Sequence, residues 1–216
     1  TKFSIKSSNN SVPFKITGQN PFTKKNYLIP MKKTKSVKAN TFNLPIKIEE
    51  VKDQFITLKG KIEINEDTIF KKQVKIEPGT NFYIKNNKNI VFKNKVIAIG
   101  TKENPITFEI NQKNKNLKWG TIALDGQGTA NSVLQNMIIK DGSGSVIDHV
   151  YFTSMLSLHN TTNIKLINLS MKNNSIYDDS LHLIYCNNVL IDNLIVENAF
   201  ADALDIDISK NILIKN

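Results

Sequence analysis

The stretch Asn163-Ile-Lys-Leu-Ile-Asn-Leu-Ser-Met-Lys-Asn173 recurs 25 residues later as Asn188-Val-Leu-Ile-Asp-Asn-Leu-Ile-Val-Glu-Asn198. Asp179-Ser-Leu-His-Leu183 then matches Asp202-Ala-Leu-Asp-Ile206, which lies 23 residues further along the chain. A repeat in the low twenties, with short β-rich runs and Asn at turn positions, is typical of a solenoid. The pattern predicts an all-β fold made of successive coils of a parallel β-helix.

The same alternation extends back toward the N-terminus. From Ile46 onward, runs such as Lys61-Ile-Glu-Ile-Asn65 and Val96-Ile-Ala-Ile-Gly100 alternate with a period of two residues, as strands do. We therefore predict a parallel β-helix over residues 46–216. Residues 1–45 are dominated by Ser, Asn, Pro and Lys, which favours an irregular N-terminal linker or cap.

The ends of the chain and its hydropathy give further expectations. The sequence begins at Thr1 and stops at Asn216 in the middle of a repeat, so we expect further domains of the same chain. No apolar run approaches the length of a membrane span, so no transmembrane segment is expected.

The net charge of +10 is spread unevenly, and Lys supplies all of its basic side chains. Residues 1–60 contain 12 Lys and 3 acidic residues, whereas residues 136–216 contain 5 Lys and 9 acidic residues. Without Arg, the bidentate fork that suits phosphate or guanine is missing, and aromatic residues are not interleaved with the Lys. We interpret the Lys as a solvated surface and expect no nucleic-acid partner, although an anionic polysaccharide or lipid surface would suit the same charge.

Two sets of aligned residues have a structural interpretation. Cys186 is the single cysteine, which excludes an intrachain disulfide, and it aligns with Ser209 of the next coil. We therefore expect a small packed residue there and not a catalytic thiol. A column of amides is expected to stack from coil to coil through hydrogen bonds: Asn136, Asn168, Asn193 and Asn216.

Residues 73–124 carry motifs of a known superfamily. They are Gln73-Val-Lys-Ile-Glu-Pro-Gly-Thr80, Val96-Ile-Ala-Ile-Gly-Thr101, Asn104-Pro-Ile-Thr-Phe108 and Trp119-Gly-Thr-Ile-Ala-Leu124. The series resembles the opening coils of right-handed parallel β-helix proteins of the pectate-lyase-like superfamily. This resemblance implies a right-handed coil, but that superfamily includes lyases, hydrolases and plain binding solenoids.

A second resemblance concerns the late coils. Phe200-Ala-Asp-Ala-Leu-Asp-Ile-Asp207 follows a strand of the Ile-x-Asn type and is similar to coils of the β-helix domain found after spore-coat-kinase-like domains in bacterial surface proteins. The likeness covers roughly residues 46–216. It implies a bacterial protein that is extracellular, on the cell surface or periplasmic.

The repeat is interrupted between Asp125 and Ser154. Asp141-Gly-Ser-Gly-Ser145 opens a longer connection, and the solenoid resumes at Phe152. Such connections project from one face and can wall a binding groove, or they can be simple loops. The sequence leaves both interpretations open.

Apolar pairs at positions i and i+2 fix which side chains face inward. These pairs are Ile122 with Leu124, Leu156 with Leu158, Leu181 with Leu183, and Leu204 with Ile206. The residues between and after them should form two outward columns, because neighbouring strand residues point to opposite faces. The first column is Ala123, Ser157, His182 and Asp205, and the second is Asp125, His159, Ile184 and Asp207.

These columns predict a candidate site on the outer face. Stacking should place His182 over Asp205, and Asp205 about 7 Å from Asp207 on one strand. The three are candidate catalytic residues, since paired carboxylates serve as acid and base in glycoside hydrolysis. A bound polysaccharide would also contact Asp125, His159, Ser157 and Trp119. Trp119 is alternatively a packing residue at a coil corner.

A metal interpretation uses the neighbouring carboxylates. Asp178, Asp179 and Asp202 could hold a Ca²⁺ ion that pairs with a uronate, whereas the sequence implies no other cofactor. The alternative is that outward positions are polar anyway and that Asp at turns bonds to local backbone.

Two functional hypotheses follow from these observations. The first is a non-catalytic β-helix domain of a secreted or surface protein that contacts carbohydrate along the outer face of its C-terminal coils. The second is a polysaccharide lyase or glycoside hydrolase fragment that uses the Asp and His cluster. The chain departs from the enzyme patterns of the superfamily. The lyases use an Arg or Lys base, whereas this chain has no Arg and its late coils hold only Lys210 and Lys215. The Gly-His-Gly coil of the hydrolases is not present within these residues.

Overall fold

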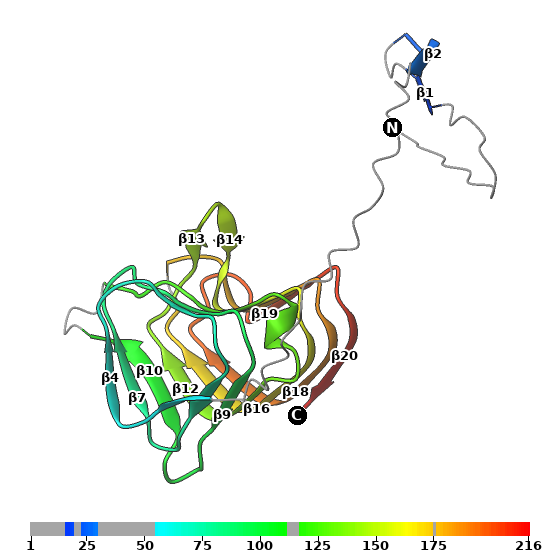
Figure 1. The fold of residues 1–216 in the computed structure, drawn as a ribbon. Helices are drawn as coiled ribbons and strands as arrows, with labels where there is room; N and C mark the ends of the chain where they lie inside the picture. Colours follow the sequence, from blue (N-terminus) through cyan, green and yellow to red (C-terminus); the bar gives the residue numbers. More distant parts are fainter. Residues whose placement is uncertain (1–15, 20–22, 30–54, 112–116, 175) are drawn as a thin grey trace, which may run out of the picture. The chain divides into compact units, whose positions relative to one another are not determined.

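The structure is a computed structural model that describes residues 16–19, 23–29, 55–111, 117–174 and 176–216 (Figure 1). The chain divides into two compact units, Thr1–Glu49 and Glu50–Asn216. In the first unit, β1 (Ile16–Gln19) pairs antiparallel with β2 (Asn26–Ile29). The predictions for the rest of residues 1–45 and for residues 46–54 fall outside the described residues.

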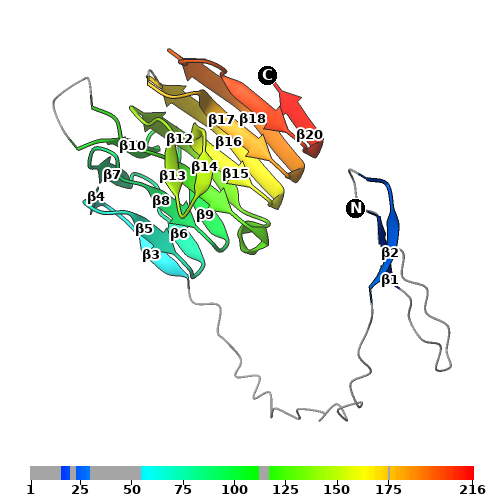
Figure 2. The ribbon, with the colours of Figure 1, turned by 90° about the horizontal axis from the view of Figure 1, so that it is seen from above.

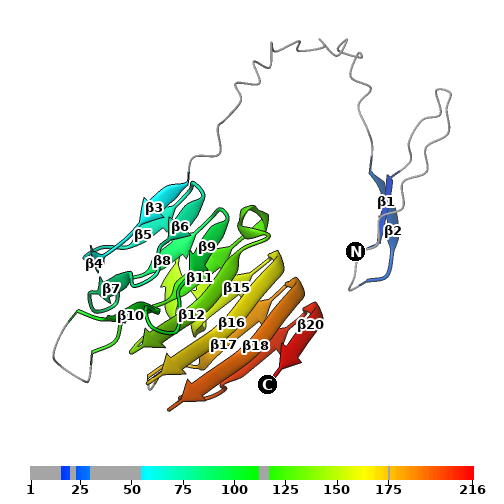
Figure 3. The same ribbon diagram turned by 90° about the horizontal axis from the view of Figure 1, so that it is seen from below.

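The second unit is built from two parallel sheets. Sheet I has ten strands: β3 (Ile56–Leu58), β4 (Lys61–Ile64), β6 (Val74–Ile76), β7 (Asn81–Ile84), β9 (Val96–Ile99), β10 (Ile106–Ile110), β12 (Val133–Lys140), β16 (Thr162–Lys172), β18 (Asn187–Glu197) and β20 (Lys210–Lys215). Sheet II has six strands: β5 (Thr68–Phe70), β8 (Ile90–Phe92), β11 (Ile122–Asp125), β15 (Ser154–His159), β17 (Asp179–Ile184) and β19 (Leu204–Asp207). The chain passes from one sheet to the other in every coil, so the prediction of an all-β parallel solenoid is confirmed (Figure 3).

The interior is filled by the predicted apolar pairs. Ile122, Leu156, Leu181 and Leu204 stand in one register across β11, β15, β17 and β19, and Leu124, Leu158, Leu183 and Ile206 stand in another. The pairs of β11, β15 and β17 are at most 1% exposed. Ile206, on the outermost strand of sheet II, is 37% exposed. The predicted inward and outward columns are therefore confirmed.

Asparagine ladders fix the corners of the coils. Asn136, Asn168 and Asn193 have positive φ angles of 51°, 52° and 59°, which Asn tolerates better than most residues. The Nδ2 of Asn193 donates to Asn168 Oδ1 and that of Asn168 to Asn136 Oδ1, both at 2.9 Å. This confirms the stacked amides, except that Asn216 donates to Asp192 Oδ1 instead, at 3.2 Å.

Cys186 has the packing role that its alignment predicts. Its backbone N–H donates to Ser209 Oγ at 2.9 Å in the next coil, and its side chain lies in the core. Burial raises the pKa of the Cys186 thiol, which disfavours the reactive thiolate.

The long connection after Asp141 forms a hairpin that projects from the solenoid (Figure 1). β13 (Ser145–Ile147) pairs antiparallel with β14 (Val150–Phe152). The two turn residues, Asp148 and His149, both have positive φ, as tight hairpin turns require. At its base, Phe152 packs on Val91 of β8 and Ala123 of β11, so the hairpin covers part of the outer face of sheet II (Figure 2).

Helical structure is almost absent from the described part of the chain, where the 3₁₀ turn η1 (Gln127–Thr129) follows β11. No helix in these ranges has the length and apolarity needed to cross a membrane.

Candidate functional site

His182 lies at the centre of the candidate site, on the outer face of β17. Its side chain is 6% exposed, and its Nδ1 lies 2.7 Å from Thr153 Oγ1. Its Nε2 faces the next strand, 3.8 Å from Asp205 Oδ2 and 3.5 Å from Asp207 Oδ2, and has no hydrogen-bond partner. His182 therefore stacks over Asp205 as predicted, but the separation is too long for the expected charge-assisted hydrogen bond.

Asp205 and Asp207 form the exposed side of this cluster. Their side chains are 39% and 55% exposed, because β19 is the last strand of sheet II. Both carboxylates are therefore open to solvent on one side and face a buried imidazole on the other.

Asp179 is the first residue of β17 and is more deeply buried than the other acidic residues near His182. It is 2% exposed, and Thr153 Oγ1 donates to its Oδ2 at 3.5 Å. Burial raises the pKa of Asp179 to about 6, and the negative charges of Asp178 and Asp205 add to this effect, while His182 opposes it. The Asp179 carboxyl thus keeps its proton at a pH where an ordinary Asp is ionised.

The acidic residues group differently from the metal prediction. In the described ranges, the group of ligating side chains that converge closely enough to hold an ion is His182, Asp205 and Asp207, whose ligand atoms lie within 4.8 Å of one another. The predicted set of Asp178, Asp179 and Asp202 is not such a group: Asp179 is buried, whereas Asp178 and Asp202 are exposed.

His159 is packed under the hairpin. Its ring centroid lies 4.5 Å from that of Phe152 and 5.8 Å from that of His182. Burial lowers the pKa of His159 to about 4, as does the nearby His182, and Asp125 only partly offsets this. His159 is therefore neutral at pH 7 and separates Asp125 from the cluster around His182.

Three of the predicted binding residues are not available as expected. Ser157 is fully buried, with its hydroxyl 2.8 Å from Ser154 Oγ. Trp119 is 1% exposed and its Nε1 donates to Lys140 O at 2.7 Å, so it packs at the coil corner. Asp125 pairs with the Lys93 ammonium one coil earlier, and its side chain is 20% exposed.

The structure adds residues that the sequence reasoning missed. Exposed aromatic side chains flank the cluster at both ends of the strands: Tyr177 is 38% exposed, Phe200 is 61% exposed and Tyr185 is 56% exposed. Tyr177 directly precedes Asp178, whose carbonyl accepts from the N–H of Ala201, next to Phe200. The sequence did contain a signal for two of them, because Tyr177 and Phe200 occupy the same turn position in two successive coils.

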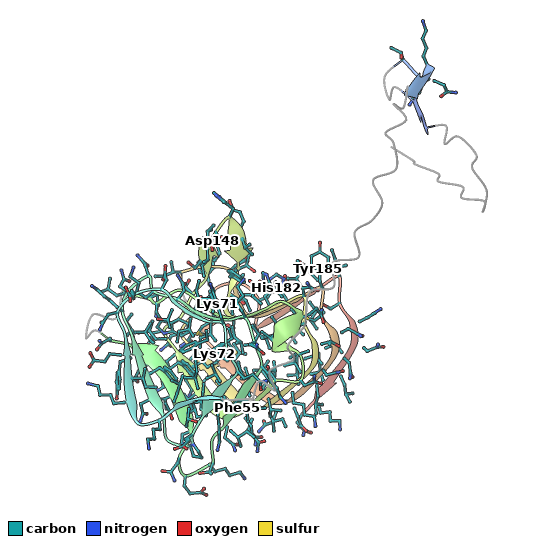
Figure 4. The ribbon with its side chains drawn as sticks, viewed as in Figure 1. Phe55, Lys71, Lys72, Asp148, His182 and Tyr185 are labelled. Atoms are coloured by element: carbon teal, nitrogen blue, oxygen red, sulfur yellow. The ribbon has the colours of Figure 1, made fainter. Side chains whose placement is uncertain are left out.

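Tyr185 marks the other end of the cluster. Its N–H donates to Asp207 O at 3.2 Å, which holds the end of β17 against the end of β19. Figure 4 shows His182 and Tyr185 on the side of the solenoid from which the hairpin with Asp148 projects. The cluster therefore occupies a face bordered by the hairpin and by exposed rings.

Comparison with known proteins adds little to this geometry. No protein-family model matches the chain, and no curated protein matches it. A solved structure described as a "putative glycosyl hydrolase" from Parabacteroides merdae ATCC 43184 matches with 10% sequence identity, over 73% of this chain and 79% of that chain. Its TM-score is 0.36, and a likeness at that level carries no argument about function.

Proposed function

We propose that this chain is a carbohydrate-binding β-helix domain of a secreted or surface protein, and that it contacts a polysaccharide along the outer face of β17 and β19. The observation that carries the proposal is the combination of exposed carboxylates with exposed aromatic rings on these strands and in the turns next to them. Carboxylate oxygens accept hydrogen bonds from sugar hydroxyls, and aromatic faces pack against the apolar face of a sugar ring.

The charge of this face narrows the ligand class. Asp178, Asp202, Asp205 and Asp207 are at least partly exposed there. A uronate-rich chain would be repelled by these carboxylates, so a neutral polysaccharide is the better ligand. The resemblance of residues 73–124 to the pectate-lyase-like superfamily, and of the late coils to domains after spore-coat-kinase-like domains, supports a bacterial surface location and a polysaccharide partner.

Titration calorimetry with neutral and uronate-containing oligosaccharides tests the proposal. Tyr185→Ala and Phe200→Ala should each weaken binding about fivefold, because each removes a stacking contact worth on the order of 1 kcal/mol. Tyr151→Ala is the matched control, since Tyr151 is an aromatic residue of comparable exposure, 64%, that lies on the hairpin and not at the ends of β17 and β19. Absence of any oligosaccharide binding, or equal loss in all three variants, contradicts the proposal.

A second candidate function is cleavage of the bound polysaccharide. The observation that favours it is the Asp179 carboxyl, protonated up to a pH of about 6, near the carboxylate of Asp205. An assay for new reducing ends or unsaturated products separates the two candidates. Turnover that Asp205→Asn abolishes supports cleavage, whereas binding without turnover leaves the domain as a binding module.

A further inference from the structure

We propose that His182, Asp205 and Asp207 form a binding site for one divalent transition-metal ion of the Zn²⁺ type. The proposal rests on the arrangement of the three ligand atoms and goes beyond carbohydrate binding. It also differs from the predicted Ca²⁺ site, which involves other residues and only oxygen ligands.

The spacing of the ligand atoms is the first argument. Nε2 of His182 lies 3.5 Å from Asp207 Oδ2 and 3.8 Å from Asp205 Oδ2. These separations exceed the 2.7–2.9 Å expected of a charge-assisted hydrogen bond. Two ligands of a tetrahedral Zn²⁺ ion, each bonded at about 2.0–2.1 Å, are roughly 3.4 Å apart. Both separations from the imidazole nitrogen are therefore closer to those of two ligands on one ion than to those of a hydrogen bond, and all three ligand atoms lie within 4.8 Å of one another.

The buried imidazole is a second and independent argument. The His182 side chain is only 6% exposed, so it is more than nine-tenths buried. Its Nε2 is a buried polar atom without any hydrogen-bond partner. Leaving a buried nitrogen unpaired is unfavourable, because the atom loses its hydrogen bonds to water and gains none in the protein. This nitrogen is aimed at the two carboxylates, and a bound metal ion would satisfy all three groups at once.

The hydrogen bonds behind His182 set the orientation of the ring. Thr153 Oγ1 donates to Asp179 Oδ2 at 3.5 Å, so the same hydroxyl accepts from the Nδ1–H of His182 at 2.7 Å. This order leaves a lone pair on Nε2, directed at Asp205 and Asp207. Metal-ligating histidines commonly have such a partner on the other ring nitrogen, which fixes the tautomer.

The donor set determines the class of ion. An imidazole nitrogen with two carboxylates suits Zn²⁺ and its first-row neighbours, whereas Ca²⁺ prefers six to eight oxygen ligands. Three protein ligands leave a fourth position for water or another ligand. That position faces solvent, because Asp205 and Asp207 are 39% and 55% exposed.

The test is metal binding by the full chain after removal of metals with a chelator, in the absence of any carbohydrate. We expect Zn²⁺ to bind in a 1:1 ratio by titration calorimetry, and Co²⁺ to give visible absorption bands with an imidazole ligand. Asp207→Asn should weaken Zn²⁺ binding on the order of tenfold or more, as should Thr153→Val through the orientation of the ring. His182→Ala should abolish binding.

His149→Ala is the matched control, because His149 is an exposed imidazole at the hairpin turn outside the cluster. It should bind Zn²⁺ like the wild type. Because His182→Ala removes a buried side chain, circular dichroism is used to check that this variant folds. If it does not fold, the test rests on Asp207→Asn, which changes an exposed side chain. No binding by the wild type, or equal affinity in Asp207→Asn, overturns the proposal.

Because these measurements contain no sugar, they are independent of the proposed function. If the wild-type chain binds oligosaccharide but not Zn²⁺, the metal site alone is rejected. Zn²⁺ binding without oligosaccharide binding would reject the carbohydrate proposal alone. Zn²⁺ binding by a folded His182→Ala variant with the affinity of the wild type would show that the imidazole is not a ligand, and would also overturn the metal site.

Discussion

Strands β8 and β11 present Val91 and Ala123 on the outer face of sheet II, where β17 and β19 present His182 and Asp205 in the same column. The first two side chains are apolar and lie under Phe152 of the hairpin. The other two are polar and lie beyond it. One repeated backbone position thus serves as a packing surface in the early coils and as a candidate site in the late coils. The side chain and its cover decide the role, and not the coil geometry.

The largest expected effect comes from removing the cover. Phe152→Ala should lower the free energy of unfolding by about 3 kcal/mol, because it deletes a buried ring that packs on Val91 and Ala123. It should also raise the pKa of His159 toward its ordinary range, since the ring of Phe152 lies 4.5 Å from that of His159. Urea denaturation and NMR titration of the histidines measure the two effects.

Tyr151→Ala is the control for this prediction, because Tyr151 is the neighbour of Phe152 on β14 and its side chain is 64% exposed. It should change stability by no more than about 0.5 kcal/mol. If both substitutions have the same small effect, the hairpin does not stabilise the covered half of the face.

An intermediate effect is expected from two titrating groups, His159 and Asp179, which lie between the covered and the open part of the outer face of sheet II. The pKa of His159 is lowered from 6.5 to about 4, so the unfolded chain binds more protons between these values and stability rises with pH. The pKa of Asp179 is raised from 3.8 to about 6, so the folded chain binds more protons and stability falls as pH rises through 6. The two contributions oppose each other in the wild type.

Single substitutions should therefore separate them. Between pH 4 and 7, the gain in stability with rising pH should be larger than in the wild type in Asp179→Asn and smaller in His159→Gln. Each difference should be about 1–2 kcal/mol, because solvent screening reduces the full effect of the pKa shifts. Urea denaturation at several pH values measures the profiles. Parallel profiles for the wild type and both variants would contradict the assigned shifts, and His149→Gln serves as the exposed control.

The smallest effect is expected from the ion pair on the covered side. Asp125→Asn removes the partner of Lys93, whose side chain is 47% exposed, so the cost should be about 0.5 kcal/mol and should shrink in high salt. Denaturation at two salt concentrations measures it. A cost above about 2 kcal/mol would mean that Asp125 does more than pair with a surface ammonium.

Much of the fold was predictable because a solenoid repeats one local rule. The apolar residues of Leu181-His182-Leu183 and Leu204-Asp205-Ile206 fix the inward face, and the register of His182 with Asp205 follows directly. The pairing of Lys93 with Asp125 could have been found in the same way, because Lys93 directly follows Phe92 and Asp125 directly follows Leu124, and Phe92 is paired in register with Leu124.

The cover of the outer face could not be predicted by that rule. The hairpin lies outside the repeat, and its Phe152 contacts residues of two earlier coils, so periodicity carries no signal for it. Burial of Ser157, the shifted pKa of His159 and the unpaired Nε2 of His182 all depend on packing between distant segments, whereas the packing of Trp119 at a coil corner was one of the two interpretations of the sequence. Whether an outward polar residue is exposed is a property of the assembled structure and not of the coil.

The amide ladders have a consequence for how this chain could be elongated. Residues 163–187 contain one complete set of ladder positions, from Asn163 through Asn168 and Asn173, and the next set begins at Asn188. A duplicated copy of this segment would meet matching amides on both sides, so the domain could grow by a whole turn. Inserting two or three residues within β16 would instead displace every rung that follows.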